Sequence, residues 1–184
     1  MYFKTKELVT MALFGAMIFT LVFVLGAVVL SVTGIPMSAG ITNVFITVVV
    51  ITIGAKIINK FGVATVMTAI AGTLSIPTIS FGTPGIYKII TLGLVGLIID
   101  LAISLLKRSN KGFILGGLLG SGLTVPITFA AMILLGLPGV DKMKPFILMF
   151  SLIYAVLGAM GAWFGAWLFE KKLKNKAFVK NLQG

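Results

Sequence analysis

Two ionisable side chains stand inside the long apolar stretches of this sequence, and their types could support chemistry there. Lys88 and Asp100 lie in the stretch between Pro84 and Leu106. An ionisable group that faces lipid is costly, so such residues usually mark a binding site, an ion path or a paired charge. On a helix that begins near Pro84, Asp100 would lie about 18 Å deeper than Lys88 and be turned by roughly 120°. The two side chains therefore cannot pair with each other, and each needs another partner.

Lys88 has three candidate partners. Its ammonium group could reach lipid headgroups, pair with Asp141 in a later loop, or bind an anionic ligand. The ligand option gains support from nearby residues that supply an aromatic face and hydroxyl groups, namely Thr78, Ser80, Thr83 and Tyr87. Asp100 has Lys107 within reach two turns further along the helix, and a structural ion pair is the favoured interpretation.

The last apolar stretch carries two more candidates. Tyr154 and Trp163 lie inside it, away from the lysine-rich tail. Either ring could stack on a planar ligand or fill the core of a helix bundle, and core packing is favoured.

No arrangement of residues indicates an enzyme. The chain has no cysteine and no histidine, which excludes a thiolate nucleophile, a histidine base and the commonest metal ligands. Ser121 therefore has no histidine to activate it. The glycine-rich stretch 116–122 lacks the lysine and the preceding strand of a phosphate-binding loop, so it indicates helix packing. We expect no catalysis, no cofactor and no metal site.

Membrane-spanning helices must position these residues. Hydrophobic residues make up 59% of the 184 residues and charged residues only 10%, against about 25% charged in a soluble domain. Apolar stretches bounded by charges, Gly and Pro predict an all-α integral membrane protein with a single domain, residues 1–184. The predicted bundle has six transmembrane helices, roughly at residues 8–32, 43–58, 62–76, 85–106, 113–137 and 145–169.

The basic residues indicate how these helices are oriented. Lys and Arg cluster near both ends of the chain and in the loops at 56–60 and 107–111, whereas the opposite loops offer only Lys142 and Lys144. Both termini should therefore be cytoplasmic, in a multi-pass protein of the cell membrane. This alternation explains the net charge of +11 by the lipid bilayer rather than by nucleic acid. The uncharged outward loops at 33–43 and 75–85 are either tight turns or lids over the mouth of the bundle.

The stretch TKELVTMALFGA, Thr5 to Ala16, places Ala12 and Ala16 four residues apart near the cytoplasmic end of the first predicted helix. Together with six spans, inward termini, a short chain and apolar outward loops, it resembles the substrate-binding S components of energy-coupling factor (ECF) vitamin transporters. The resemblance implies that the face of Ala12, Gly15 and Ala16 contacts a transmembrane coupling subunit, which is held by two cytoplasmic ATPases. Small residues of this kind allow close approach between helices in lipid.

The same resemblance implies a ligand site under the outward loops at 33–43, 75–88 and 138–144. The implied contacts are Asn43, Thr78, Ser80, Tyr87, Lys88, Asp141, Tyr154 and Trp163. The expected ligand is a vitamin-like small molecule that the sequence does not identify, and Lys88 favours one that carries a carboxylate or phosphate.

Two other functions compete with this one. The main alternative is a small standalone secondary transporter, which usually keeps buried carboxylates along its path. The other is a membrane protein without a transport role, either a lipid-modifying enzyme or an assembly factor.

Overall fold

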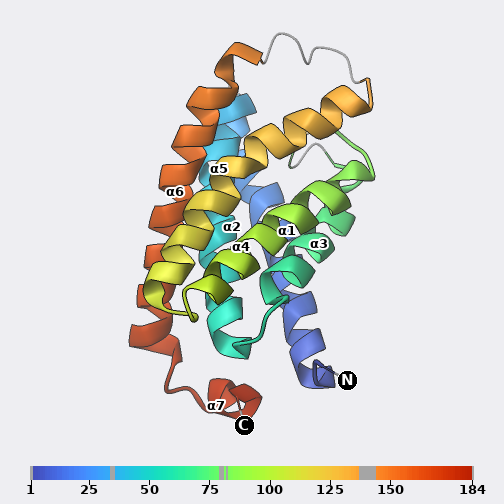
Figure 1. The fold of residues 1–184 in the computed structure, drawn as a ribbon. Coiled ribbons are helices and arrows are strands. Elements are labelled where there is room, and N and C mark those ends of the chain that lie inside the picture. The colour runs from blue at the N-terminus through green and yellow to red at the C-terminus, as the bar shows by residue number, and fades with distance from the viewer. Residues whose placement is uncertain (1, 34–35, 79–80, 82, 137–143, 184) are drawn as a thin grey trace.

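The computed structural model describes residues 2–33, 36–78, 81, 83–136 and 144–183, and the regular elements within these ranges are helices (Figure 1). In chain order they are α1 (Thr5–Thr33), α2 (Pro36–Ile58), α3 (Val63–Ser75), α4 (Tyr87–Leu105), α5 (Asn110–Leu134), α6 (Ile147–Leu168), the π-helical turn η2 (Phe169–Leu173) and α7 (Ala177–Gln183).

Six helices in the described part of the chain pack as a closed ring. The main neighbours in space follow the order α1, α2, α6, α5, α4, α3 and back to α1. The start of α1, the end of α2 and α7 lie together at one end of the ring, where Lys4, Ile58 and Leu182 line a small polar pocket (Figure 1). We call this the terminal end and the opposite one the far end.

The helices are consistent with a multi-pass helical membrane protein, as predicted. Among the described residues, α1, α2, α4, α5 and α6 are long and apolar enough to cross a membrane. Large apolar side chains such as Leu13, Leu94 and Leu152 are exposed on the outside of the bundle, which suits lipid better than water. α3 has 13 residues, about 20 Å of helix against a hydrocarbon core of about 30 Å. That the predicted span at 62–76, which corresponds to α3, crosses the membrane therefore stays a prediction.

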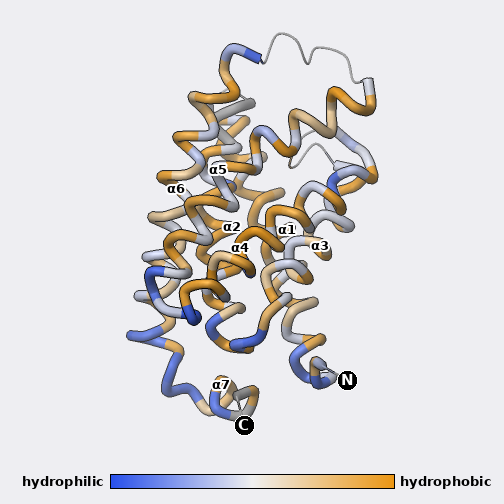
Figure 2. Tube along the Cα trace, viewed as in Figure 1, coloured by the Kyte–Doolittle hydropathy of each residue, from blue (hydrophilic) through white to orange (hydrophobic). Residues whose placement is uncertain are grey.

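Basic residues gather at the terminal end. Figure 2 shows hydrophilic segments concentrated there, while the helix bodies are mostly hydrophobic. Among the described Lys and Arg residues, only Lys88 and Lys144 lie elsewhere along the chain. At this end Lys60 pairs with Glu7 at 2.8 Å, which holds the start of α1 against the loop after α2.

Three helices begin earlier than predicted, and the first is α1, which starts at Thr5 rather than near residue 8. α2 starts at Pro36 rather than near residue 43, since proline suits the first helical position, where no N–H is needed. The prediction that 33–43 is an outward loop was therefore wrong for most of its length. α5 starts at Asn110 rather than at residue 113, because the Ser109 hydroxyl accepts a hydrogen bond from the Gly112 amide at 3.3 Å and caps the first turn.

Glycines set the closest helix contacts. Gly117 of α5 and Gly158 of α6 face each other so closely that a Cβ atom on either would overlap the carbonyl oxygen of the other. On the other side of α5, a Cβ atom on Gly116 would lie 3.1 Å from the Ile99 carbonyl oxygen of α4. The prediction that the stretch 116–122 packs helices is confirmed.

Replacing Gly117 by alanine should force α5 and α6 apart and lower the free energy of unfolding by about 1–3 kcal/mol, as overpacking does. The matched control is Gly93→Ala in α4, where an added Cβ atom meets nothing within 4 Å. Denaturant unfolding in detergent should separate the two variants. Equal stabilities would contradict the close contact between α5 and α6.

Candidate binding cavity

A cavity of about 720 Å³ lies in the half of the ring towards the far end. Its walls are formed mainly by the second half of α1, the first half of α2, α4, α5 and the start of α6. Residues that precede α4 also contribute. Most of the lining is apolar and includes Val22, Leu30, Val48, Leu92, Ile99, Phe129, Met132 and Ile147. Small-molecule sites in proteins have volumes of about 300–1,000 Å³, so the cavity has the size of a solute site.

Two side-chain oxygen atoms in this lining have no hydrogen-bond partner among the described residues. Asn43 and Thr47 lie one turn apart on α2, and both line the cavity. Asn43 Oδ1 and Thr47 Oγ1 are buried and have no hydrogen-bond partner among the described residues. A buried polar atom without a partner destabilises a protein by about 1–3 kcal/mol, so such atoms usually meet water or a ligand.

Tyr154 of α6 also lines the cavity, as the predicted ligand site requires. Its hydroxyl group lies against α2 so closely that a Cβ atom on Gly40 would overlap it. Its ring meets Phe150 edge-on, with centroids 6.4 Å apart. Asn43, Thr47 and Tyr154 thus place polar groups from two neighbouring helices in a mainly apolar wall.

Lys88 does not line this cavity. Its side chain is 0% exposed, and its Nζ atom donates to the carbonyl oxygens of Ser75 at 3.0 Å and Thr78 at 2.6 Å. These carbonyls belong to the end of α3 and the turn after it, where a cation complements the helix dipole. The described partners of Lys88 are thus backbone groups, and a direct contact between Lys88 and a ligand stays a prediction.

Tyr87 holds a different part of the chain, the segment just before α4. Its hydroxyl donates to the Thr83 carbonyl at 2.9 Å and lies 3.0 Å from the Thr83 hydroxyl. Thr83 lines the cavity, whereas Tyr87 is buried and does not. Tyr87 therefore positions part of the wall, and its role in ligand binding also stays a prediction.

Asp100 caps the start of α3. Its carboxylate accepts hydrogen bonds from the Thr65 amide and hydroxyl, both at 2.8 Å, and from the Ala64 amide at 3.3 Å. An anion at a helix N-terminus satisfies amides that have no partner within the helix and complements its dipole. The predicted ion pair with Lys107 was wrong, because the nearby charge is Arg108. Burial lowers the pKa of the Arg108 guanidinium, and Asp100 acts in the opposite direction.

The two buried ionisable residues of α4 thus hold the two ends of α3. Asp100 contacts its first turn and Lys88 its last carbonyls. α3 and α4 run antiparallel, so the spacing of Lys88 and Asp100 on α4 matches the length of α3. Each charge has the sign that the adjacent end of the helix dipole favours.

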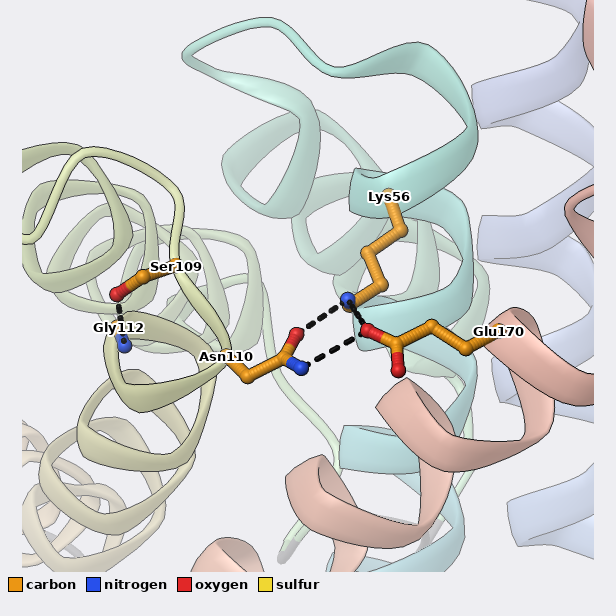
Figure 3. Close-up of polar contacts among 5 residues, drawn as sticks. All are labelled: Lys56, Ser109, Asn110, Gly112 and Glu170. Carbon is orange, nitrogen blue, oxygen red and sulfur yellow. Dashed lines mark hydrogen bonds and ion pairs between the residues drawn. The ribbon is translucent and has the colours of Figure 1, made fainter.

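A separate polar network joins three elements at the terminal end (Figure 3). Lys56 of α2 donates to Asn110 of α5 at 2.6 Å and to Glu170 of η2 at 3.1 Å, while Asn110 donates to Glu170 at 2.8 Å. The Lys56 ammonium also lies 5.1 Å from the ring centre of Phe113. None of these residues lines the cavity, so the network ties helices together away from it.

The predicted partner face of α1 divides into an outer and an inner part. Ala12 is exposed and Ala16 half-buried on the outside of the ring. Gly15 is buried, and a Cβ atom there would lie 2.8 Å from the Met67 carbonyl oxygen of α3. Gly15 therefore packs within the chain, and only Ala12 and Ala16 are accessible to a partner.

Among the other predicted contacts, Trp163 and Thr78 do not line the cavity. The Trp163 side chain is 59% exposed and is absent from the lining. Ser80 and Asp141 lie outside the described residues. Thr78 contributes its carbonyl to Lys88, and its hydroxyl donates to the Ser75 carbonyl at 3.0 Å.

The cavity also contains residues that the sequence did not single out. Thr47 is the polar neighbour of Asn43, and Phe81, Phe146 and Phe150 add rings to the lining. Two polar residues four apart in a helix share one face, and this spacing could have identified Thr47 beside Asn43.

Searches against family models, curated proteins and solved structures return no match for this chain. The fold and the cavity are therefore the basis for any assignment. They are consistent with a multi-pass helical membrane protein whose ring of helices encloses a space of solute size.

Proposed function

We propose that the chain is the solute-binding subunit of an importer of the energy-coupling factor type. In this proposal it captures a small molecule at the outer face of the cell membrane. It then delivers the molecule by association with a transmembrane coupling subunit and two cytoplasmic ATPases. The observation that carries the proposal is the cavity, with its two unpartnered polar atoms on α2.

The distribution of charge supports the direction of capture. Basic residues mark the cytoplasmic side of a membrane protein, and in this chain they gather at the terminal end. If that end is cytoplasmic, the cavity lies in the half of the ring towards the outer face. In the proposed topology α3 crosses the membrane together with the five long helices. Lys88 and Asp100 then stabilise its two ends within the membrane.

The outer face of α1 supports the coupling step. Ala12 is exposed near the terminal end, beside Val9 and Leu13, which are exposed as well. A helix that must bind a partner and release it benefits from small residues, because backbones approach closely without a polar penalty.

The alternative of a standalone secondary transporter has less support. Ion-coupled carriers use charged residues on the solute path. Within the described ranges, no Asp, Glu, Lys or Arg lines the cavity. Asp100 and Lys88 form hydrogen bonds with α3 instead.

Mass spectrometry of small molecules released by denaturing the purified protein tests the proposal. We expect one compound in a near-stoichiometric amount. Thr128→Trp places a large ring in the cavity lining and should reduce the released compound at least tenfold. Leu123→Trp is the matched control on the same helix, since Leu123 is 41% exposed and does not line the cavity.

Release of lipid alone by the unmodified protein, or equal amounts of compound from the Thr128→Trp and Leu123→Trp variants, would contradict solute binding in this cavity. Uptake driven by a proton or sodium gradient in liposomes that hold only this chain would favour the standalone transporter.

A further inference from the structure

The chemistry of the cavity narrows the class of solute. We infer that the cavity takes an uncharged, mainly apolar small molecule that donates a hydrogen bond to Asn43. This inference rests on the proposed function, because it describes the solute that the proposed subunit would capture.

The absence of charged side chains in the described lining favours an uncharged solute. In the parts of the chain that the structure describes, the cavity is lined by apolar residues and by neutral polar residues only. A charged solute loses its hydration in such a site and needs an opposite charge to compensate. Lys88, the cation that was predicted from the sequence to contact the ligand, is instead buried beside the end of α3. An anionic solute would therefore meet no compensating charge in the described lining.

The unpartnered oxygens of Asn43 and Thr47 favour a solute that donates a hydrogen bond. Asn43 Oδ1 accepts hydrogen bonds and cannot donate them, whereas the Thr47 hydroxyl can do either. Both atoms are buried, and the torsion that turns an asparagine amide is soft, so a small rotation can present Oδ1 to a solute. A hydroxyl or N–H group on the solute would satisfy Asn43 and remove the penalty of its unpaired oxygen.

Aromatic rings in the lining favour a solute with an apolar body. Phe129, Phe150 and Tyr154 line the cavity from α5 and α6. Aromatic rings favour offset or edge-on contact with other rings, and Phe150 and Tyr154 are already arranged edge-on. The body of the solute should therefore be apolar, and a ring suits it best.

Three probes with one ring system separate the effect of charge from the effect of a hydrogen-bond donor. 2-Naphthalenemethanol is neutral and donates a hydrogen bond, 2-methylnaphthalene is neutral without a donor, and 2-naphthoate is an anion at pH 8. Binding to the full chain, stripped of any co-purified compound, is measured by equilibrium dialysis in detergent with empty micelles as the blank. We expect the alcohol to bind about threefold to tenfold more tightly than the hydrocarbon and at least tenfold more tightly than the carboxylate.

Variants show whether Asn43 produces the preference. Asn43→Leu should remove the advantage of the alcohol over the hydrocarbon. Thr47→Val, in which the new side chain has nearly the shape of threonine, should reduce this advantage. Ser151→Ala is the matched control, because Ser151 Oγ is also buried without a partner in the described chain but does not line the cavity. That variant should keep the full preference.

Four results would overturn the inference: no saturable binding of any probe, a carboxylate that binds as tightly as the alcohol, an alcohol that binds no more tightly than the hydrocarbon, or an Asn43→Leu variant that keeps the preference.

A different result would contradict the proposed function. If the probes bind as expected but uptake in cells does not depend on the outer face of α1, the solute class stands and the coupling role falls. If the co-purified compound is an anion held in the cavity, the solute class falls and the proposed function stands.

Discussion

Replacing Asp100 by alanine is expected to lower the free energy of unfolding by about 2–4 kcal/mol, measured by denaturant unfolding in detergent. The carboxylate accepts three hydrogen bonds from Ala64 and Thr65 at the start of α3. Alanine would leave the backbone amides of Ala64 and Thr65 without an acceptor and would remove the anion that complements the helix dipole. It would also leave the half-buried Arg108 without its nearby anion.

Lys107→Met provides the matched control for this prediction. The sequence alone pairs Asp100 with Lys107, whereas Lys107 is exposed and the Asp100 carboxylate contacts α3. Removing the Lys107 charge should therefore change stability by less than about 0.5 kcal/mol, as at most exposed sites. A larger loss in the Lys107 variant than in the Asp100 variant would restore the ion pair and contradict the cap on α3.

The stability of α3 matters because this helix is too short to span a bilayer alone. It has 13 residues, and each of its ends carries backbone groups that water cannot satisfy in lipid. Asp100 supplies acceptors to the first turn and Lys88 supplies donors to the last carbonyls. Two costly ionisable residues on α4 thus allow a short neighbour to remain in the ring.

Hydropathy was sufficient to predict the class of protein but not the helix ends. Long apolar stretches are the main determinant of membrane insertion, so most of the predicted spans overlap the observed helices closely. The ends depend on local backbone chemistry instead. Pro36 begins α2, and Ser109 caps α5, and neither residue is conspicuous in a hydropathy profile.

The partners of Lys88 and Asp100 could not be predicted by matching charged side chains. The sequence excludes a pair between them, which the structure bears out, but their partners are mainly backbone groups of α3. Every residue has such groups, so no residue type marks them. The one available signal was their spacing, which matches the length of the preceding short helix.

Hydropathy did not distinguish the inner face of α6 from its outer face. Its residues are apolar all round, because one side packs on helices and the other meets lipid, and hydropathy then gives no periodic signal. Helical spacing alone could have separated Tyr154 from Trp163, since nine residues turn a helix by about 180° beyond two full turns. Tyr154 accordingly lines the cavity, while Trp163 is exposed.

Replacing Ala12 by tryptophan is expected to reduce solute uptake in cells at least tenfold while leaving binding to the purified protein unchanged. Ala12 is exposed on α1 near the terminal end and does not line the cavity. A bulky side chain there would keep a partner helix at a distance, whereas the cavity in the other half of the ring would remain intact. Uptake is measured with the compound that the purified protein releases.

Leu101→Trp is the control, because it adds the same side chain to an exposed position on α4, where Leu101 is 47% exposed. It should leave both uptake and binding unchanged. Ala16→Trp should resemble Ala12→Trp in uptake, but Ala16 is half-buried, so its unfolding must be compared first. Gly15→Ala should act on stability instead, since Gly15 packs against α3. Normal uptake with tryptophan at Ala12 would remove the outer face of α1 from the coupling step, and the small residues of this helix would then serve packing within the chain alone.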